Sequence, residues 1–153
     1  SINLETSLNR FAEQGLFSDR LLQFKYAYLT IKENLIAGNG LDKYSYIDKS
    51  LVPIYLKDQI IGAHNGYLSI LAQYGLIFGG LILFIIFRKS LECFSFFKNR
   101  NRFERVYLYI ILYTLLASIY ESLMTGINEF NTILFWLSLS LLSYTKFREQ
   151  HEI

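Results

Sequence analysis

His64 is the residue of this sequence best suited to chemistry, because it is an ionisable side chain at the edge of an apolar segment. The loop Gly62-Ala63-His64-Asn65-Gly66-Tyr67 leads directly into an apolar run, Tyr67 to Phe87, that is long enough to cross a bilayer. The positive end of a helix dipole at this point disfavours the imidazolium and favours a neutral imidazole that can accept a proton. Unpaired amides at the same helix start suit a phosphate. The alternative is that His64 and Asn65 only cap the helix.

Two cations and one acid are the other candidate site residues. Arg10 and Arg20 carry guanidinium groups that can bind a diphosphate at two oxygens, although an arginine in a polar loop is more often simply solvated. Glu121 lies near the end of an expected membrane helix, where a carboxylate is costly unless it is paired or hydrated. A pairing or functional role and a side chain that merely reaches the surface both fit this position. The turn Gly38-Asn39-Gly40 can form a phosphate-binding nest, but a plain turn is favoured.

The composition indicates an integral membrane protein. Of the 153 residues, 52% are hydrophobic and 17% aromatic, which is more apolar than a soluble domain of this size needs. The single cysteine, Cys93, excludes an internal disulfide and a cysteine-based metal cluster, and with only two histidines we expect no metal site and no cofactor. The net charge of +2 gives no indication of a nucleic-acid partner. The chain starts Ser-Ile-Asn without an export signal, so we expect the C-terminal part of a longer polytopic protein.

The expected fold is all-α, with an extracytoplasmic loop region over 1–63 and a transmembrane region over 64–153. Three spans are expected at about 67–87, 106–125 and 130–145. The connector 88–105 holds six Lys or Arg against two Glu, and a short basic loop of this kind stays in the cytoplasm. Residues 1–63 must then lie outside the membrane, with His64 at its outer surface.

One amphipathic helix is expected in the outer loop region. Ser18-Asp19 is a typical helix start, and the helix should stop before Gly38. Apolar residues recur at spacings of three or four and predict its buried stripe: Leu21, Phe24, Tyr28, Ile31 and Leu35. Arg20 falls near the edge of this stripe. Residues 42–61 read as an irregular loop.

Several short motifs, taken in order, resemble the C-terminal half of the O-antigen ligase and O-antigen polymerase superfamily. They are Asn9-Arg10-Phe11, Arg20 with Phe24 and Ala27, Asn34 to Gly40, Ala63-His64-Asn65-Gly66-Tyr67-Leu68, Gly75-Leu76-Ile77 and Glu121-Ser122-Leu123. The resemblance covers most of the chain. The sequence departs from the family pattern at Phe24, where the family often has Trp, and at Phe78, which displaces a glycine.

The resemblance implies a metal-independent glycosyltransferase of the bacterial inner membrane, with its site on the outer face. The donor would be an oligosaccharide linked to a polyprenyl diphosphate; a flippase and a chain-length regulator are the implied partner proteins. His64 would be the general base, Arg20 and Arg10 would bind the diphosphate, and Asn65 and Glu121 would support them. An O-antigen polymerase is the first choice and a ligase that transfers the glycan to lipid A core or protein the second. The rival of another class is a non-catalytic transport or sensor component.

Overall fold

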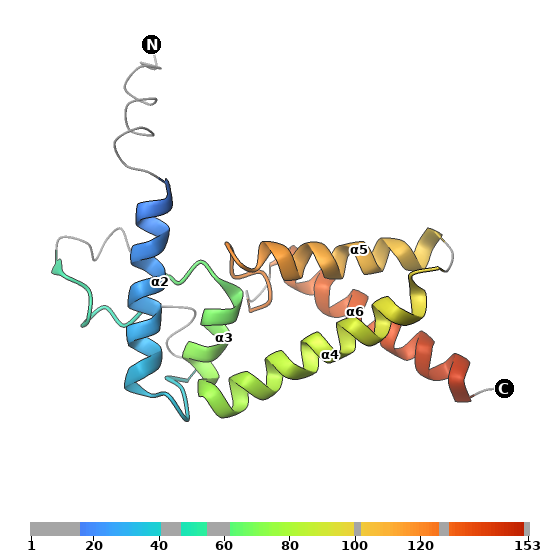
Figure 1. Ribbon diagram of the computed structural model, residues 1–153, viewed down its shortest axis with the longest axis horizontal. Helices are drawn as coiled ribbons and strands as arrows, with labels where there is room; N and C mark the ends of the chain where they lie inside the picture. Colours follow the sequence, from blue (N-terminus) through green and yellow to red (C-terminus); the bar gives the residue numbers. More distant parts are fainter. Residues whose placement is uncertain (1–15, 41–46, 55–61, 100–101, 126–128, 152–153) are drawn as a thin grey trace, which may run out of the picture.

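The computed structural model describes residues 16–40, 47–54, 62–99, 102–125 and 129–151, and the regular structure of these residues is helical. The order is α2 (Leu16–Glu33), α3 (Gly66–Tyr74), the π-helix η3 (Gly75–Gly79), α4 (Gly80–Phe97), α5 (Arg102–Ala117) and α6 (Phe130–His151). Helices α4, α5 and α6 pack together, and α2 runs across one end of them with α3 beside it (Figure 1). The all-α prediction is therefore confirmed.

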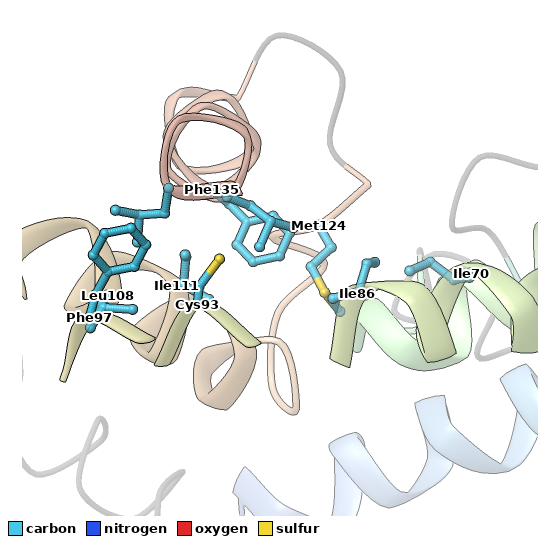
Figure 2. Packing of buried hydrophobic residues seen from close by; sticks show 10 residues of the cluster. Ile70, Ile86, Cys93, Phe97, Leu108, Ile111, Met124 and Phe135 are labelled. Atoms are coloured by element: carbon cyan, nitrogen blue, oxygen red, sulfur yellow. The ribbon is translucent and has the colours of Figure 1, made fainter. Parts of the chain in front are cut away.

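Two apolar clusters hold these helices together. The larger one joins α4, α5 and α6, with Phe97 and Phe135 fully buried and Cys93 and Met124 beside them (Figure 2). The smaller one joins the buried face of α2 to the chain that precedes α3, and its buried residues are Tyr26, Ala27, Ile47, Val52 and Ala63. Burial of large apolar side chains is the main stabilising contribution to each cluster. The second cluster attaches α2 to the chain that carries His64.

Helix α2 confirms the helix expected in the outer loop region, but the prediction of its buried stripe was partly wrong. The buried face carries Tyr26, Ala27, Thr30 and Ile31. Three residues of the expected stripe, Leu21, Tyr28 and Leu35, are instead exposed. The reason is that apolar residues occur on two opposite sides of this helix, and periodicity alone does not say which side faces the protein.

The apolar run after His64 is helical but broken. Helix α3 stops at Tyr74, Gly75 takes φ 69° and ψ −175°, and the chain resumes as η3 and α4. Within the described residues, one helical stretch, Gly66–Phe97, is long and apolar enough to cross a membrane. It extends ten residues into the expected cytoplasmic connector. Of the three expected spans, the structure thus supports one.

The other two expected spans differ from the observed helices at their ends. Helix α5 stops at Ala117 rather than near residue 125, and α6 continues to His151 rather than residue 145. Glu121 therefore lies in the turn after α5 and not inside a membrane helix, which corrects the sequence-based placement. The carbonyls that close this turn accept bonds from distant donors, and a sequence pattern contains no sign of them.

The break at Gly75 is completed by the turn that follows α2. The amides of Asn39 and Gly40 donate to the carbonyls of Ala72 and Gln73, at 2.8 and 2.9 Å, and Leu76 N–H donates to the Leu35 carbonyl at 2.7 Å. These bonds replace the helical bonds that the break removes. The Gly38 amide is also paired, with the Asn34 carbonyl at 2.8 Å. The favoured reading of Gly38-Asn39-Gly40 as a plain turn agrees with this pairing, because no amide of the turn is free for a phosphate nest.

Gly75 must be glycine both because its φ is positive and because a side chain would overlap the neighbouring backbone. Alanine substitutions at three glycines should therefore differ in their effect on stability. A Cβ at Gly75 would stand 2.2 Å from the Ile36 carbonyl oxygen at a positive φ, whereas Gly40 has a positive φ but open space, and Gly80 has neither restriction. Thermal unfolding in detergent should therefore rank Gly75→Ala as most destabilising and Gly40→Ala as intermediate. Gly80→Ala should be neutral or stabilising by up to about 1 kcal/mol, because alanine favours helix. Equal midpoints for Gly75→Ala and Gly80→Ala would contradict the junction.

Candidate functional site

Glu121 joins two of the residues that the sequence singled out. Its Oε1 accepts a hydrogen bond from Arg20 Nη2 at 3.1 Å, and its Oε2 lies 3.4 Å from His64 Nδ1. Arg20 Nη1 also donates to the Tyr120 carbonyl at 2.7 Å. The side chains of Arg20, His64 and Glu121 are 35%, 41% and 49% exposed, so the group is accessible from outside. One turn thus brings a guanidinium from α2 and an imidazole from the α3 loop to the same carboxylate.

The contact with Glu121 determines which imidazole nitrogen is available for proton transfer. A carboxylate only accepts hydrogen bonds, so the proton of this contact is on Nδ1. In the neutral ring Nε2 then keeps its lone pair and can act as a base. His64 has φ 41°, a conformation that is uncommon outside glycine and costs about 1–3 kcal/mol. Hydrogen bonds of neighbouring residues must therefore hold the backbone of His64 in this conformation.

Asn65 provides those bonds on the α3 side. Its side-chain oxygen caps α3 by accepting from Leu68 N–H at 2.9 Å, and its side-chain nitrogen donates to the Ile119 carbonyl at 2.8 Å. The next residue, Gly66, donates its amide to the Ser118 carbonyl at 2.8 Å. The helix cap is therefore present: Asn65 caps α3 and thereby fixes the backbone that carries His64, while the role of His64 as a base stays a prediction.

Two of the amides at the helix start are already hydrogen-bonded within the protein, and the phosphate site expected there stays a prediction. The amide of Gly66 is taken by carbonyls of the turn after α5, and the amide of Leu68 is taken by Asn65. A Cβ at Gly66 would stand 3.1 Å from both Ser118 and Met124, so this approach is close. Arg20 is a permanently charged cation in the described part of the site. Arg10, the other expected cation, lies outside the described residues.

Partial burial by itself raises the pKa of Glu121, but hydrogen bonds from Arg20 and His64 and their charges outweigh it. The net result is a pKa below the usual value for a glutamate. Glu121 is therefore an anion at neutral pH and stabilises the guanidinium beside it. Among the described residues, no group of three or more His, Cys, Asp or Glu is placed to hold a metal ion.

Sequence reasoning identified the charged residues of the site but missed the main-chain carbonyls. The carbonyls of Ser118, Ile119 and Tyr120 each accept a bond from α2 or from the α3 loop. Two signals pointed to this turn: the ionisable side chain of Glu121 near the end of an expected helix, and the resemblance of Glu121-Ser122-Leu123 to a family position.

The two bonds of Asn65 can be separated by substitution. Asn65→Asp keeps the oxygen that caps α3 but loses the donor to Ile119, whereas Asn65→Ala loses both. We expect Asn65→Ala to lower the free energy of unfolding by about 1–2 kcal/mol and Asn65→Asp to lower it by less. Thermal unfolding of the two variants measures the difference. A larger loss for Asn65→Asp would show that the cap is not the dominant bond.

The lowered pKa of Glu121 gives a pH dependence with a definite sign. A group whose pKa is depressed by folding stabilises the protein above its unfolded pKa, and this contribution is lost as pH falls through the folded pKa. The wild type should lose thermal stability below about pH 4, and Glu121→Gln should lose less over the same interval. Glu129→Gln, which removes an exposed carboxylate outside the site, is the control and should follow the wild type. Identical acid profiles for wild type and Glu121→Gln would refute the assignment.

The comparison with known proteins identifies the family. Residues 1–86 match the family model described as O-antigen ligase, which covers more than half of the 153 residues. No curated protein and no solved structure matches the chain. The matched residues include Arg20 and His64 and end before Glu121, so the Glu121 contacts come from the structure alone. The chain therefore belongs to the O-antigen ligase family, whose members are membrane-bound glycosyltransferase-type enzymes of polysaccharide assembly.

Proposed function

We propose that the protein is a metal-independent glycosyltransferase that moves an oligosaccharide from a polyprenyl diphosphate carrier to an acceptor hydroxyl. The observation that carries the proposal is that Glu121 contacts both Arg20 and His64. An anion-binding cation and a base with a free nitrogen on one open surface are the two groups that this reaction needs. The described helix long and apolar enough for a membrane starts at Gly66, two residues after His64, so a carrier lipid in the bilayer can present its head group here.

His64 acts as the general base in this proposal. Its Nε2 takes the proton of the acceptor hydroxyl as the acceptor oxygen attacks the anomeric carbon of the donor sugar. The bond between that carbon and the diphosphate oxygen breaks, and its electron pair leaves with the diphosphate. Glu121 positions the ring and stabilises the imidazolium that forms, because its carboxylate faces Nδ1.

Arg20 binds the diphosphate and stabilises the charge that develops on it. The bonds to Tyr120 and Glu121 use two of the five N–H donors of the guanidinium, and the others are available to phosphate oxygens. Arg10 is assigned as a second cation for the same diphosphate. Guanidinium groups then supply the charge compensation that a divalent metal supplies in other transferases.

The acceptor defines two versions of the proposal. Polymerisation, in which the acceptor is the sugar of another lipid-linked repeat unit, is the first. Ligation to lipid A core or to protein is the second, and the matching family includes both ligases and polymerases. In both versions the site lies on the outer face of the bacterial inner membrane, where a flippase delivers the donor.

Substitution of the two groups tests the chemistry. His64→Ala should reduce glycan transfer by about 10²–10⁴-fold while the protein still inserts, and Arg20→Lys should reduce it by about 10²-fold because an ammonium lacks the two-pronged grip. His151→Ala, which removes the other histidine, and Arg105→Lys, at an exposed position on α5, are the matched controls. Transfer is measured by the amount and length of glycan in cells with equal protein levels. Normal chains in the His64→Ala strain would end the catalytic proposal.

A deletion strain separates the two versions. Loss of long chains, with a single repeat unit still attached to its acceptor, is the result expected for a polymerase. Loss of all attachment, with lipid-linked polymer accumulating, is the result expected for a ligase. An unchanged glycan profile would contradict both.

A further inference from the structure

The outward face of α2 carries an alternating row of apolar and basic side chains. Leu21, Tyr28 and Leu35 are 66%, 54% and 45% exposed, and Lys25 and Lys32 between them are exposed as well. The spacing of four, three and four residues from Leu21 to Lys32 places these four residues on one side of α2, and Leu35 lies in the turn that follows the helix. The buried face, with Tyr26, Ala27 and Thr30, is the opposite side. This outward face, from Leu21 on α2 to Leu35 in the turn after it, therefore exposes apolar side chains that do not contact the protein core.

The outward face continues onto the bend of the candidate membrane span. Leu76 N–H donates to the Leu35 carbonyl at 2.7 Å, so the end of the α2 face and the start of η3 are in direct contact. At this junction Ile36, Leu76, Ile77 and Phe78 are all more than half exposed. The exposed apolar side chains of α2 thus merge with those of the stretch Gly66–Phe97, which has the length and composition to cross a membrane.

We propose that α2 lies on the membrane surface, with this face against a bilayer that contains anionic phospholipids. Leu, Ile and Tyr side chains enter the boundary between head groups and acyl chains, and the two lysines contact the lipid phosphates, as in amphipathic interfacial helices. Lys32 Nζ lies 5.0 Å from the centre of the Tyr28 ring, so the cation and the aromatic ring occupy the same interfacial depth. Part of the region expected to be an extracytoplasmic loop is then bound to lipid.

This placement gives the lipid contact a function that rests on the proposed transferase activity. Arg20 is the residue next to Leu21, at the site end of the face, and it bonds to Tyr120 and Glu121. A helix held on the bilayer keeps that guanidinium at the height of lipid phosphates. The diphosphate of a lipid carrier is at the same height.

Spin labelling tests the placement without reading transfer activity. Cysteines are introduced at Tyr28 and Ile36, each labelled with a nitroxide in vesicles of phosphatidylglycerol and phosphatidylcholine; the natural Cys93 is 1% exposed and adds no accessible thiol. Lys49→Cys is the control for a label exposed to water. Residues 47 and 52 pack on the buried face of α2, so the turn between them lies on the side of α2 opposite to the outward face. Phe84→Cys, on the exposed side of α4, is the control for lipid.

Labels at positions 28 and 36 should collide with oxygen at a rate close to that of the label at position 84. Their collision rate with a water-soluble nickel chelate should be lower than that of the label at position 49. Replacing phosphatidylglycerol by phosphatidylcholine should increase the collision rate of the label at position 28 with the nickel chelate. The double substitution Lys25→Gln and Lys32→Gln should have the same effect. Nickel collisions at 28 and 36 equal to those at 49 would overturn the proposal. Protection from both reagents would also overturn it, because the face would then be covered by protein. Since no outcome depends on glycan transfer, failure of the base assigned to His64 would leave the result unchanged.

Discussion

The rest of the structure depends on the hydrogen bonds that other segments donate to the turn after α5. Its carbonyls are the unpaired acceptors at the end of a helix, and such groups need donors when they are removed from water. Asn65 and Gly66 at the start of α3 and Arg20 on α2 supply them. Three segments far apart in the sequence are thereby fixed at one point. The carboxylate of Glu121 lies at that point and faces both ionisable partners.

The second constraint is the close backbone contact between the turn after α2 and the break in the apolar run. Gly38 and Gly75 approach so closely that a Cβ on either would overlap main-chain atoms of the other segment. The same contact supplies amides to carbonyls that a regular helix would have paired internally. A broken helix in an apolar environment is stable only when such partners exist, because an unpaired peptide group there costs several kcal/mol.

The sequence predicted the all-helical class and the presence of α2, because both depend on local features. Helix α2 is confirmed, and the structure brings together Arg20, His64 and Glu121, which the sequence singles out by their ionisable side chains. The break at Gly75 was not predicted, since Leu76, Ile77 and Phe78 continue the apolar pattern without interruption. The amide donors of Asn39 and Gly40, which bond to Ala72 and Gln73, decide it from an earlier part of the chain. The end of α5 at Ala117 has the same kind of cause, and no proline or glycine marks it.

Helices α2 and α3 run in the same direction and are fastened to their surroundings at both ends. At one end Arg20 and the α3 start share the turn after α5, and at the other end Leu35 to Gly40 bond to Ala72 to Leu76. Sliding of one helix along the other would break bonds at both ends at once. The two helices are therefore held as one unit, and the π-helical stretch from Gly75 to Gly79 is the junction between this unit and α4.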